Sequence, residues 1–313
     1  MASHSVVTFT MNPAVDLFGE TTEIFADSKT RCVQTALIPG GGGINVARNM
    51  RRMGSETLAI FPAGGPNGQY LTQLLESEGQ QVAAIPIQAH TRQNFAITDT
   101  SEKLMHHFVF PGPKLTRAEV DACKAKLSAT SQNMLVLSGS LPDDINPSFY
   151  AEVTAEVAQR GCKVLLDTSG KALSETLFHG AYLAKLNRKE FASLGYDEYA
   201  SLAELKAQMQ DLVARGAVDV LIVTLTLGGA VLVSKDGDCW YISAPEAHIV
   251  SHVGAGDAFM SALAHQLNQG APLKQAFRYG VTAAYVTVQC VGNQLEDFAW
   301  LERALDEVQE ESI

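Results

Sequence analysis

The sequence predicts an α/β protein in which helices cover both faces of a doubly wound, mainly parallel β-sheet. Short apolar runs rich in branched residues have the length and composition of buried strands, at Leu58–Phe61, Met134–Leu137, Lys163–Asp167, Val220–Leu225 and Ala230–Ser234. Longer helical patterns lie between several of them, at Arg117–Ala129, Pro147–Gln159 and Leu202–Ala214. Such alternation is typical of parallel sheets, because parallel strands are joined by helical crossovers.

Each helical stretch carries a local signal of its own. Arg117–Ala129 places Val120, Cys123 and Leu127 on one face, as a helix packed against a sheet requires. Gly161 and Gly216 follow the other two stretches, and glycine commonly ends a helix. Ligands of such folds lie outside the carboxyl ends of the strands, so we expect the functional residues there.

Two stretches, Asp16–Ile38 and Arg92–Phe110, show alternating residues with no helical pattern inside them. We expect antiparallel strands that form a small separate layer. Because the stretches are distant in sequence, that layer would be a discontinuous lid over the main domain. Two ordinary hairpins at a sheet edge would give the same pattern.

Composition and charge exclude several classes of function. The 313 residues include 23 Lys and Arg against 34 Asp and Glu, a formal net charge of −11, with 46% hydrophobic residues. This composition is globular rather than disordered. The negative balance argues against a nucleic-acid or membrane-surface partner, because both need a positive field. The longest charge-free stretch, Val220–Ser234, is too short and too polar to span a membrane.

The cysteines indicate the compartment. Five of them are scattered without a CxxC spacing, which indicates reduced thiols rather than a disulfide framework. The first 16 residues have no basic region or small-residue cleavage site of a signal peptide. We therefore expect a cytoplasmic protein.

The strongest local motif is Gly254-Ala255-Gly256-Asp257, which precedes a helical pattern ending at Gly270. Small residues before a helix allow backbone N–H groups to converge on one point, and the helix N-terminus adds partial positive charge. The result is an anion hole suited to phosphoryl transfer. Asp257 is either a catalytic base or an ordinary helix-start carboxylate.

A second motif is the run of four glycines, Gly40 to Gly43, followed by Ile44 and Asn45. Four glycines cost backbone entropy, so close approach to a ligand is one reason for them and a lid hinge is another. They do not spell GxGxxG, and no Walker A motif is present.

A third pattern is Asn187-Arg188-Lys189-Glu190, shortly after Lys185. Asn187 and Glu190 can present oxygens on one side of a helical turn, where they could hold Mg²⁺ through its waters beside a nucleotide. A solvated helix start would give the same pattern.

Together and in this order, the motifs resemble the ribokinase-like (PfkB) carbohydrate kinases. The resemblance runs from Thr8 to about Leu295, and its two signatures are GGGGINVAR and GAGD. Further segments resemble the members that act on fructose phosphates: Lys29–Cys32, Ile60–Gly65, Thr91–Asn94, Phe108–Gly112 and Ser138–Pro142. The resemblance implies one ribokinase-like domain over residues 1–313, with a β lid at about 14–38 and 90–110.

The resemblance also implies roles for particular residues. Asp257 would be the base that takes a proton from the sugar hydroxyl, with Gly254, Ala255 and Gly256 as the anion hole. The sugar and its phosphate end would be held by Asp16, Lys29, Arg31, Gly40, Gly41, Gly42, Gly43, Asn45, Arg92 and Ser140.

ATP is the cofactor that the resemblance implies, with Mg²⁺ held through water by Asn187 and Glu190. The nucleotide would be bound by Lys185, Asn187, Thr224, Thr226 and Gly229. A K⁺ ion would be bound by backbone carbonyls near Ser251, Val253 and Gly292.

The basic residues Lys29, Arg31 and Arg92 suggest the substrate. A dianionic phosphate needs them, whereas a sugar without phosphate does not. The expected reaction is ATP-dependent phosphorylation of fructose 6-phosphate to fructose 1,6-bisphosphate. Kinases of fructose 1-phosphate or tagatose 6-phosphate share the site skeleton, and a non-catalytic sugar-phosphate sensor is the alternative of another class.

The sequence departs from the family mainly in the nucleotide half. The departures are Leu186, Thr226, Leu227, His252 and Tyr285. We therefore expect ATP to bind with changed affinity or with a relaxed nucleotide preference. We also expect a homodimer through the lid, because a small β layer leaves edges that need covering.

Overall fold

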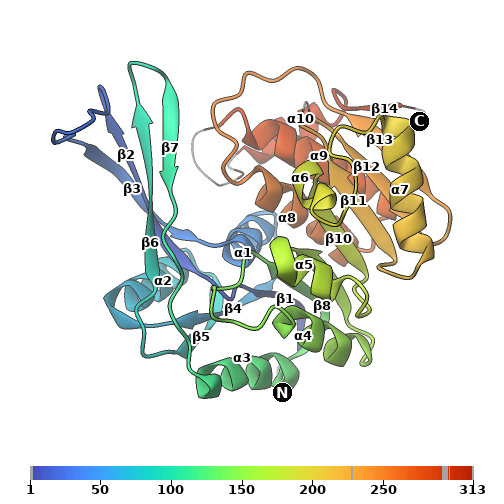
Figure 1. Cartoon of the computed structure of the whole chain (residues 1–313), viewed down its shortest axis with the longest axis horizontal. Coiled ribbons are helices and arrows are strands. Elements are labelled where there is room, and N and C mark those ends of the chain that lie inside the picture. The colour runs from blue at the N-terminus through green and yellow to red at the C-terminus, as the bar shows by residue number, and fades with distance from the viewer. Residues whose placement is uncertain (1–2, 227, 291–294, 296, 312–313) are drawn as a thin grey trace.

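The structure is a computed structural model that describes residues 3–226, 228–290, 295 and 297–311. Its main feature is a ten-stranded sheet with helices on both faces (Figure 1). In spatial order the strands are β14 (Gln309–Glu311), β13 (Cys239–Ser243), β12 (Ala230–Ser234), β11 (Val220–Thr224), β10 (Leu183–Asn187), β9 (Lys163–Asp167), β8 (Ser131–Ser138), β1 (Ser3–Phe9), β4 (Thr57–Ala63) and β5 (Gln81–Pro86).

The helices alternate with these strands along the chain. They are α1 (Gly42–Arg52), α2 (Gly65–Ser77), α3 (Arg117–Ala129), α4 (Phe149–Ala158), α5 (Gly170–Thr176), α6 (Arg188–Ala192), α7 (Leu202–Ala214), α8 (Ala255–Asn268), α9 (Leu273–Thr287) and α10 (Phe298–Ala304). Helices α3 and α7 have the bounds that the apolar pattern predicts, and α4 lies within Pro147–Gln159. Capping boxes start α3 at Thr116 and α7 at Ser201.

Strand directions confirm the predicted fold class. From β11 to β5 every neighbouring pair is parallel, and the pairs β11–β12, β12–β13 and β13–β14 at one edge are antiparallel. The chain order reverses at β1, because β4 and β5 lie on one side of it and β8 to β11 on the other. This reversal is the switch point of a doubly wound sheet.

The core has two layers because neighbouring residues of a strand point to opposite faces. On β1, Val7 packs into a cluster with residues of α3, α4 and α7, whereas Val6 packs with residues of α1, α8 and α9. Leu221 and Ile222 of β11 divide between the same two clusters. Strands buried on both faces read as continuous apolar runs, which is why the sequence reveals them. Among the described residues, no helix is long and apolar enough to cross a membrane.

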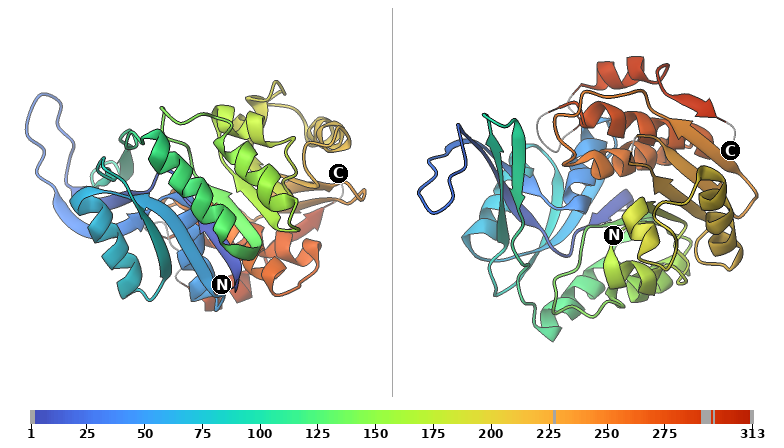
Figure 2. Two further views of the ribbon diagram at one scale, coloured as in Figure 1. Left: turned by 90° about the horizontal axis from the view of Figure 1, so that it is seen from below. Right: turned by 45° about the horizontal axis from the view of Figure 1, so that its top comes forward.

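A second sheet of four strands forms the lid beside this body (Figures 1 and 2). Its strands are β3 (Val33–Gly40), β2 (Ala14–Thr21), β6 (Arg92–Asp99) and β7 (Leu104–Phe108). The β2–β3 and β6–β7 pairs are antiparallel, as expected. The expectation of antiparallel strands is wrong for the central pair, since β2 and β6 are parallel from Ala14 opposite Arg92 to Thr21 opposite Asp99. Both strands leave the body at the same end of the lid, so they run in the same direction.

Candidate active site

The candidate site lies at the carboxyl ends of the parallel strands, between the lid and the start of α8. Ser138, Asp167 and Asn187 are the last residues of β8, β9 and β10. Fold geometry therefore gathers side chains from distant segments at one edge of the sheet, where such folds bind ligands.

Asp257 lies in the first turn of α8, after Gly254, which has a left-handed φ of 83°. No side-chain bond caps this helix. The carboxylate instead accepts a 2.8 Å hydrogen bond at Oδ2 from Asn45 Nδ2, across 212 residues of sequence. Burial raises the pKa of Asp257 to about 7, and the negative charge of Asp167 acts in the same direction, whereas Asn45 and Lys185 oppose it. A carboxylate with this pKa is half protonated near neutral pH, as suits a general base.

Lys185 and Asp167 form a buried ion pair, with Nζ 2.8 Å from Oδ2 and side chains only 7% and 12% exposed. Burial opposes the charge on Lys185, but the charge and hydrogen bond of Asp167, together with the charges of Glu190 and Asp257, outweigh it and raise the pKa of the ammonium group. A Cβ on Gly256 would lie 2.9 Å from Lys185 Nζ, so the ammonium packs against the first turn of α8. Sequence reasoning missed Asp167, although its place at the end of a predicted strand was a usable signal.

Asp16 lies on β2 and is buried, and its charge raises the pKa of Asp257, so the two carboxylates belong to one site. Its Oδ1 accepts a 2.9 Å hydrogen bond from Asn94 Nδ2 of the neighbouring strand β6. Burial raises the pKa of Asp16, while the hydrogen bond from Asn94 and the electrostatic effects of His107 and Arg92 lower it. His107 therefore lies on the same face of the lid sheet as Asp16, whereas adjacent His106 lies on the other face.

The Gly40–Gly43 run has a reason that the sequence did not reveal. A Cβ on Gly40 would lie 2.2 Å from Asp16 Oδ2, and a Cβ on Gly43 would lie 2.6 Å from the carbonyl oxygen of Phe9. Gly41 precedes α1 with a φ of 113°. The chain's own close contacts require these glycines, and Gly40 leaves the room that the Asp16 carboxylate occupies beside the end of β3.

Arg92 begins β6 at the base of the lid. Its Nη1 donates to the carbonyl oxygen of Phe110 and its Nη2 to that of Asn12, both at 2.9 Å. Asn12 in turn places its Nδ2 3.4 Å from Ser140 Oγ, in the loop after β8. Arg92 and Ser140 are thus connected through a residue that sequence reasoning did not single out.

Lys29 and Arg31 do not join Arg92 within one chain. They are exposed on the loop between β2 and β3, which projects from the far end of the lid (Figures 1 and 2). Arg92 pairs with the first residue of β2, and the loop follows its last residue. The length of β2 therefore separates them by roughly 20 Å at about 3.3 Å per residue.

On the nucleotide side, Asn187 and Glu190 bond to each other. Glu190 N–H donates to Asn187 Oδ1 at 2.9 Å, and Asn187 N–H donates to Glu190 Oε2 at 2.7 Å, so they form the capping box of α6. Burial raises the pKa of Glu190, and nearby Asp167 adds to the effect. The helix-start interpretation is therefore correct as local structure, and the carboxylate still faces the charged centre of the site.

The remaining nucleotide residues surround the end of β11. Thr224 Oγ1 donates to the carbonyl oxygen of Leu186 at 3.4 Å, Thr226 is exposed, and a Cβ on Gly229 would lie 2.4 Å from the carbonyl oxygen of Ile242. Leu186 is fully buried in the core. Tyr285 donates its hydroxyl to Glu307 at 3.0 Å.

Only part of the expected K⁺ site can be described. Buried Ser251 accepts a 3.1 Å hydrogen bond at Oγ from Val253 N–H, and its own N–H donates to the carbonyl oxygen of Val288. Gly292, like Leu227, lies outside the described residues. Within the described ranges, no group of three or more His, Cys, Asp or Glu side chains could hold a metal ion.

Comparisons with known proteins agree with this architecture. The family model described as "pfkB family carbohydrate kinase" matches residues 4–298. ATP-dependent 6-phosphofructokinase isozyme 2 of Mycobacterium tuberculosis is 35% identical over 89% of this chain and 82% of its own. The protein of that name from Escherichia coli is 32% identical over 93% and 94%. The crystal structure of E. coli phosphofructokinase-2 in complex with potassium superposes with a TM-score of 0.92 at 30% identity, over 97% of this chain and 98% of that one. The chain belongs to the pfkB family of carbohydrate kinases.

Proposed function

We propose that the protein transfers the γ-phosphoryl group of ATP to a hexose phosphate, converting fructose 6-phosphate to fructose 1,6-bisphosphate. The observation that carries this proposal is Asp257, buried at the start of α8 with a pKa raised to about 7. A group with this pKa accepts a proton from an attacking hydroxyl near neutral pH.

In the proposed step, the 1-hydroxyl oxygen of the sugar bonds to the γ-phosphorus as the bond to the β,γ-bridging oxygen breaks. The hydroxyl proton passes to the Asp257 carboxylate, and ADP leaves. The Asn45 hydrogen bond fixes the carboxylate that receives the proton. The backbone N–H groups of Gly254–Gly256 at the helix start stabilise the negative charge of the transferred group.

Asp16 and Arg92 bind different parts of the sugar phosphate. Asp16, held by Asn94, accepts hydrogen bonds from sugar hydroxyls. Arg92 binds the 6-phosphate, because a guanidinium recognises a phosphate better than any neutral group does. Gly40, which has no side chain, leaves room for the Asp16 carboxylate.

The nucleotide site consists of Lys185, Asn187, Thr224, Thr226 and Gly229. Carboxylate and amide oxygens of Asp167, Glu190 and Asn187 suit Mg²⁺, which prefers oxygen ligands and keeps its waters. Bound through Asn187 and Glu190, the ion would neutralise charge on the triphosphate.

We also propose a K⁺ ion on backbone carbonyls near Ser251 and Val253. We also propose that the protein is cytoplasmic, because its five cysteines are free in the described structure and cytoplasmic proteins keep their thiols reduced.

The test is an ADP-release assay with fructose 6-phosphate, fructose 1-phosphate and tagatose 6-phosphate. We expect the highest kcat/KM with fructose 6-phosphate. A higher value with either other sugar phosphate assigns the chain to that reaction instead. Absence of turnover with all three, together with measurable binding, favours the sensor.

Arg92→Ala should raise KM for the sugar phosphate by about 10- to 100-fold with little change in kcat. The reason is that a charge-assisted hydrogen bond contributes about 1.5–3 kcal/mol in ground and transition states alike. Steady-state kinetics over a range of fructose 6-phosphate concentrations provides the measurement. Arg117→Ala, on an exposed helix start, is the matched control. An unchanged KM would mean that Arg92 is only a structural cation.

The departures around β11 predict a relaxed nucleotide preference. We expect kcat/KM values for GTP and CTP within about tenfold of the value for ATP, equivalent to a difference of about 1.4 kcal/mol. Titration of the three nucleotides at saturating sugar phosphate measures this ratio. A strong preference for ATP contradicts the prediction.

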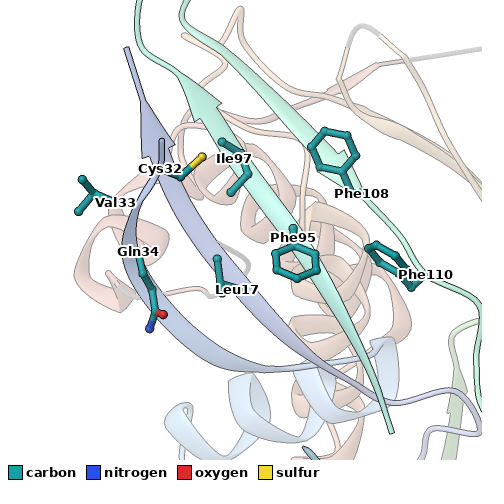
Figure 3. A pocket seen from close by; sticks show the side chains of 8 residues that line it. All are labelled: Leu17, Cys32, Val33, Gln34, Phe95, Ile97, Phe108 and Phe110. Atoms are coloured by element: carbon teal, nitrogen blue, oxygen red, sulfur yellow. The ribbon is translucent and has the colours of Figure 1, made fainter. Parts of the chain in front are cut away.

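The lid predicts a homodimer. The face of the lid sheet opposite Asp16 holds an apolar hollow of about 440 Å³ lined by Leu17, Cys32, Val33, Gln34, Phe95, Ile97, Phe108 and Phe110 (Figure 3). Val33 is 66% exposed and Phe108 is 48% exposed in one chain. A second copy would cover both this face and the edge strands β3 and β7.

Sedimentation velocity tests the assembly. Wild-type protein should be dimeric and Phe108→Asp monomeric, because a carboxylate in an apolar interface is strongly unfavourable. Tyr199→Asp, at an 87% exposed position outside the lid, should remain dimeric. A monomeric wild type contradicts the proposal.

A further inference from the structure

Asn12 lies at the switch point of the main sheet. It is in the loop that follows β1, and Ser140 is in the loop that follows the neighbouring strand β8. The chain order reverses between these strands. Such a reversal separates the loops at the carboxyl ends and leaves a crevice for a ligand.

The Asn12 side chain is buried without a full set of partners. It is 6% exposed, and its Nδ2 lies 3.4 Å from Ser140 Oγ. Its Oδ1 has no hydrogen-bond partner among the described residues. A buried polar atom left in this state costs about 1–3 kcal/mol, and native proteins keep few of them without a reason. A turn of the amide that points Oδ1 at the Ser140 hydroxyl would supply the missing partner, and it would leave Nδ2 free to donate to a ligand in the crevice.

The neighbouring cation indicates the charge of that ligand. Arg92 donates to two neutral carbonyl oxygens, one of them that of Asn12 itself, at 2.9 Å each. Arg92 Nε has no hydrogen-bond partner in the described part of the chain. A guanidinium whose hydrogen bonds go to neutral groups still attracts an anion, and a phosphate fits its planar donors.

We propose that Asn12 is a further substrate-binding residue, whose amide donates a hydrogen bond to the phosphate of the sugar phosphate. This inference rests on the proposed function. On binding, the amide turns so that Oδ1 accepts from the Ser140 hydroxyl while Nδ2 reaches the phosphate. A serine hydroxyl donates as readily as it accepts, so the contact with Ser140 persists in both orientations.

Gly112 provides a second, independent way to move the Asn12 amide. A Cβ on Gly112 would lie 2.3 Å from Asn12 Oδ1 and 2.8 Å from its Cγ. Gly112 is not among the residues with positive φ, so its backbone accepts alanine. Gly112→Ala should therefore act through the Asn12 side chain.

Isothermal titration of fructose 6-phosphate, without ATP, tests the inference. Asn12→Ala should raise its Kd by about 10- to 100-fold, the loss expected for a hydrogen bond to a charged group. Asn12→Asp should raise it further, because the new carboxylate repels the phosphate and neutralises Arg92. The Kd for ATP should not change in either variant. Asn133→Ala, at the opposite end of β8, is the control for an exposed asparagine.

The two variants should be non-additive. Gly112→Ala alone should raise the Kd, and adding it to Asn12→Ala should produce no further increase, since its target is then absent. If Asn12→Ala folds poorly, Asn12→Ser can replace it in this double-mutant comparison, because serine also lacks the amide. Thermal melting of each variant establishes that it is folded.

Three results would overturn the inference: an unchanged Kd in Asn12→Ala, tighter binding in Asn12→Asp than in Asn12→Ala, or full additivity with Gly112→Ala. The second result would show that Asn12 accepts a sugar hydroxyl instead. Failure of the proposed function is a separate result. It would appear as wild-type protein that binds fructose 6-phosphate but releases no ADP, and the Kd comparison would still stand.

Discussion

Asp257→Asn should lower kcat by about 10²- to 10⁴-fold, the usual contribution of a general base, and leave sugar-phosphate binding largely intact. Asparagine has nearly the same shape and can still bond to Asn45, but it cannot take the proton of the attacking hydroxyl. Steady-state kinetics and a binding titration measure the two effects. Asp211→Asn, an exposed carboxylate on α7, is the control. Near-normal turnover in Asp257→Asn would remove the carboxylate from the reaction.

The same carboxylate predicts a pH profile. The pKa of Asp257 is raised to about 7, so the base is protonated and inactive below that pH. We expect kcat/KM of the wild type to rise from pH 6 to pH 8 through this pKa. The residual activity of Asp257→Asn should lack this limb. A wild-type profile that is flat from pH 5 to pH 8 contradicts the assignment.

The contribution of Asp257 to folding stability should fall as the pH rises, whereas kcat/KM rises. A carboxylate with a raised folded-state pKa binds its proton more tightly in the folded than in the unfolded protein. Its contribution to stability is therefore present below the unfolded pKa near 4 and is lost as the pH rises through about 7. Thermal melting of Asp257→Asn should give a higher midpoint than wild type at pH 8, and the difference should shrink as the pH falls toward 4.

Asp167→Asn should be the most destabilising of the single substitutions considered. It leaves the Lys185 ammonium buried without its counter-charge, and breaking such a pair costs about 3–5 kcal/mol. Denaturant unfolding measures the change. Asp219→Asn is the matched control, because its pair with Lys235 is about half exposed and such surface pairs contribute about 0–1 kcal/mol. Equal losses in the two variants would contradict the buried-pair argument.

This substitution also changes the site. The negative charge of Asp167 raises the pKa of Asp257, so its removal should lower that pKa. The acidic limb of kcat/KM should then move to lower pH. A limb that stays in place would mean that Asp167 is too remote to influence the base, and a limb that moves to higher pH would contradict the sign of its effect.

Much of the main sheet and several helices follow from local pattern. The strand Lys163–Asp167 and the helices Arg117–Ala129 and Leu202–Ala214 have the same bounds in the structure as in the sequence pattern. Buried strands must be apolar on both faces, and helices must be apolar on one, so periodicity reports both. The pairing of β2 with β6 could not be predicted this way, because strand direction depends on where each segment leaves the body.

The candidate site likewise has a part that could be predicted from local sequence and a part that could not. The glycine run and the GAGD motif are visible as sequence because local backbone geometry requires small residues there. The contact of Asn45 with Asp257 spans 212 residues, and the Lys185–Asp167 pair joins different strands. Asn12 carries no motif at all.

The sequence by itself therefore determined the strand–helix order, the two glycine-rich turns and the family that they indicate. Only the tertiary structure decided which polar groups meet: that Asp167 holds Lys185, that Asn12 connects Arg92 to Ser140, and that Lys29 and Arg31 lie at the far end of the lid. The physical reason is that secondary structure depends on neighbours along the chain, whereas burial, pKa and ion pairing depend on neighbours in space.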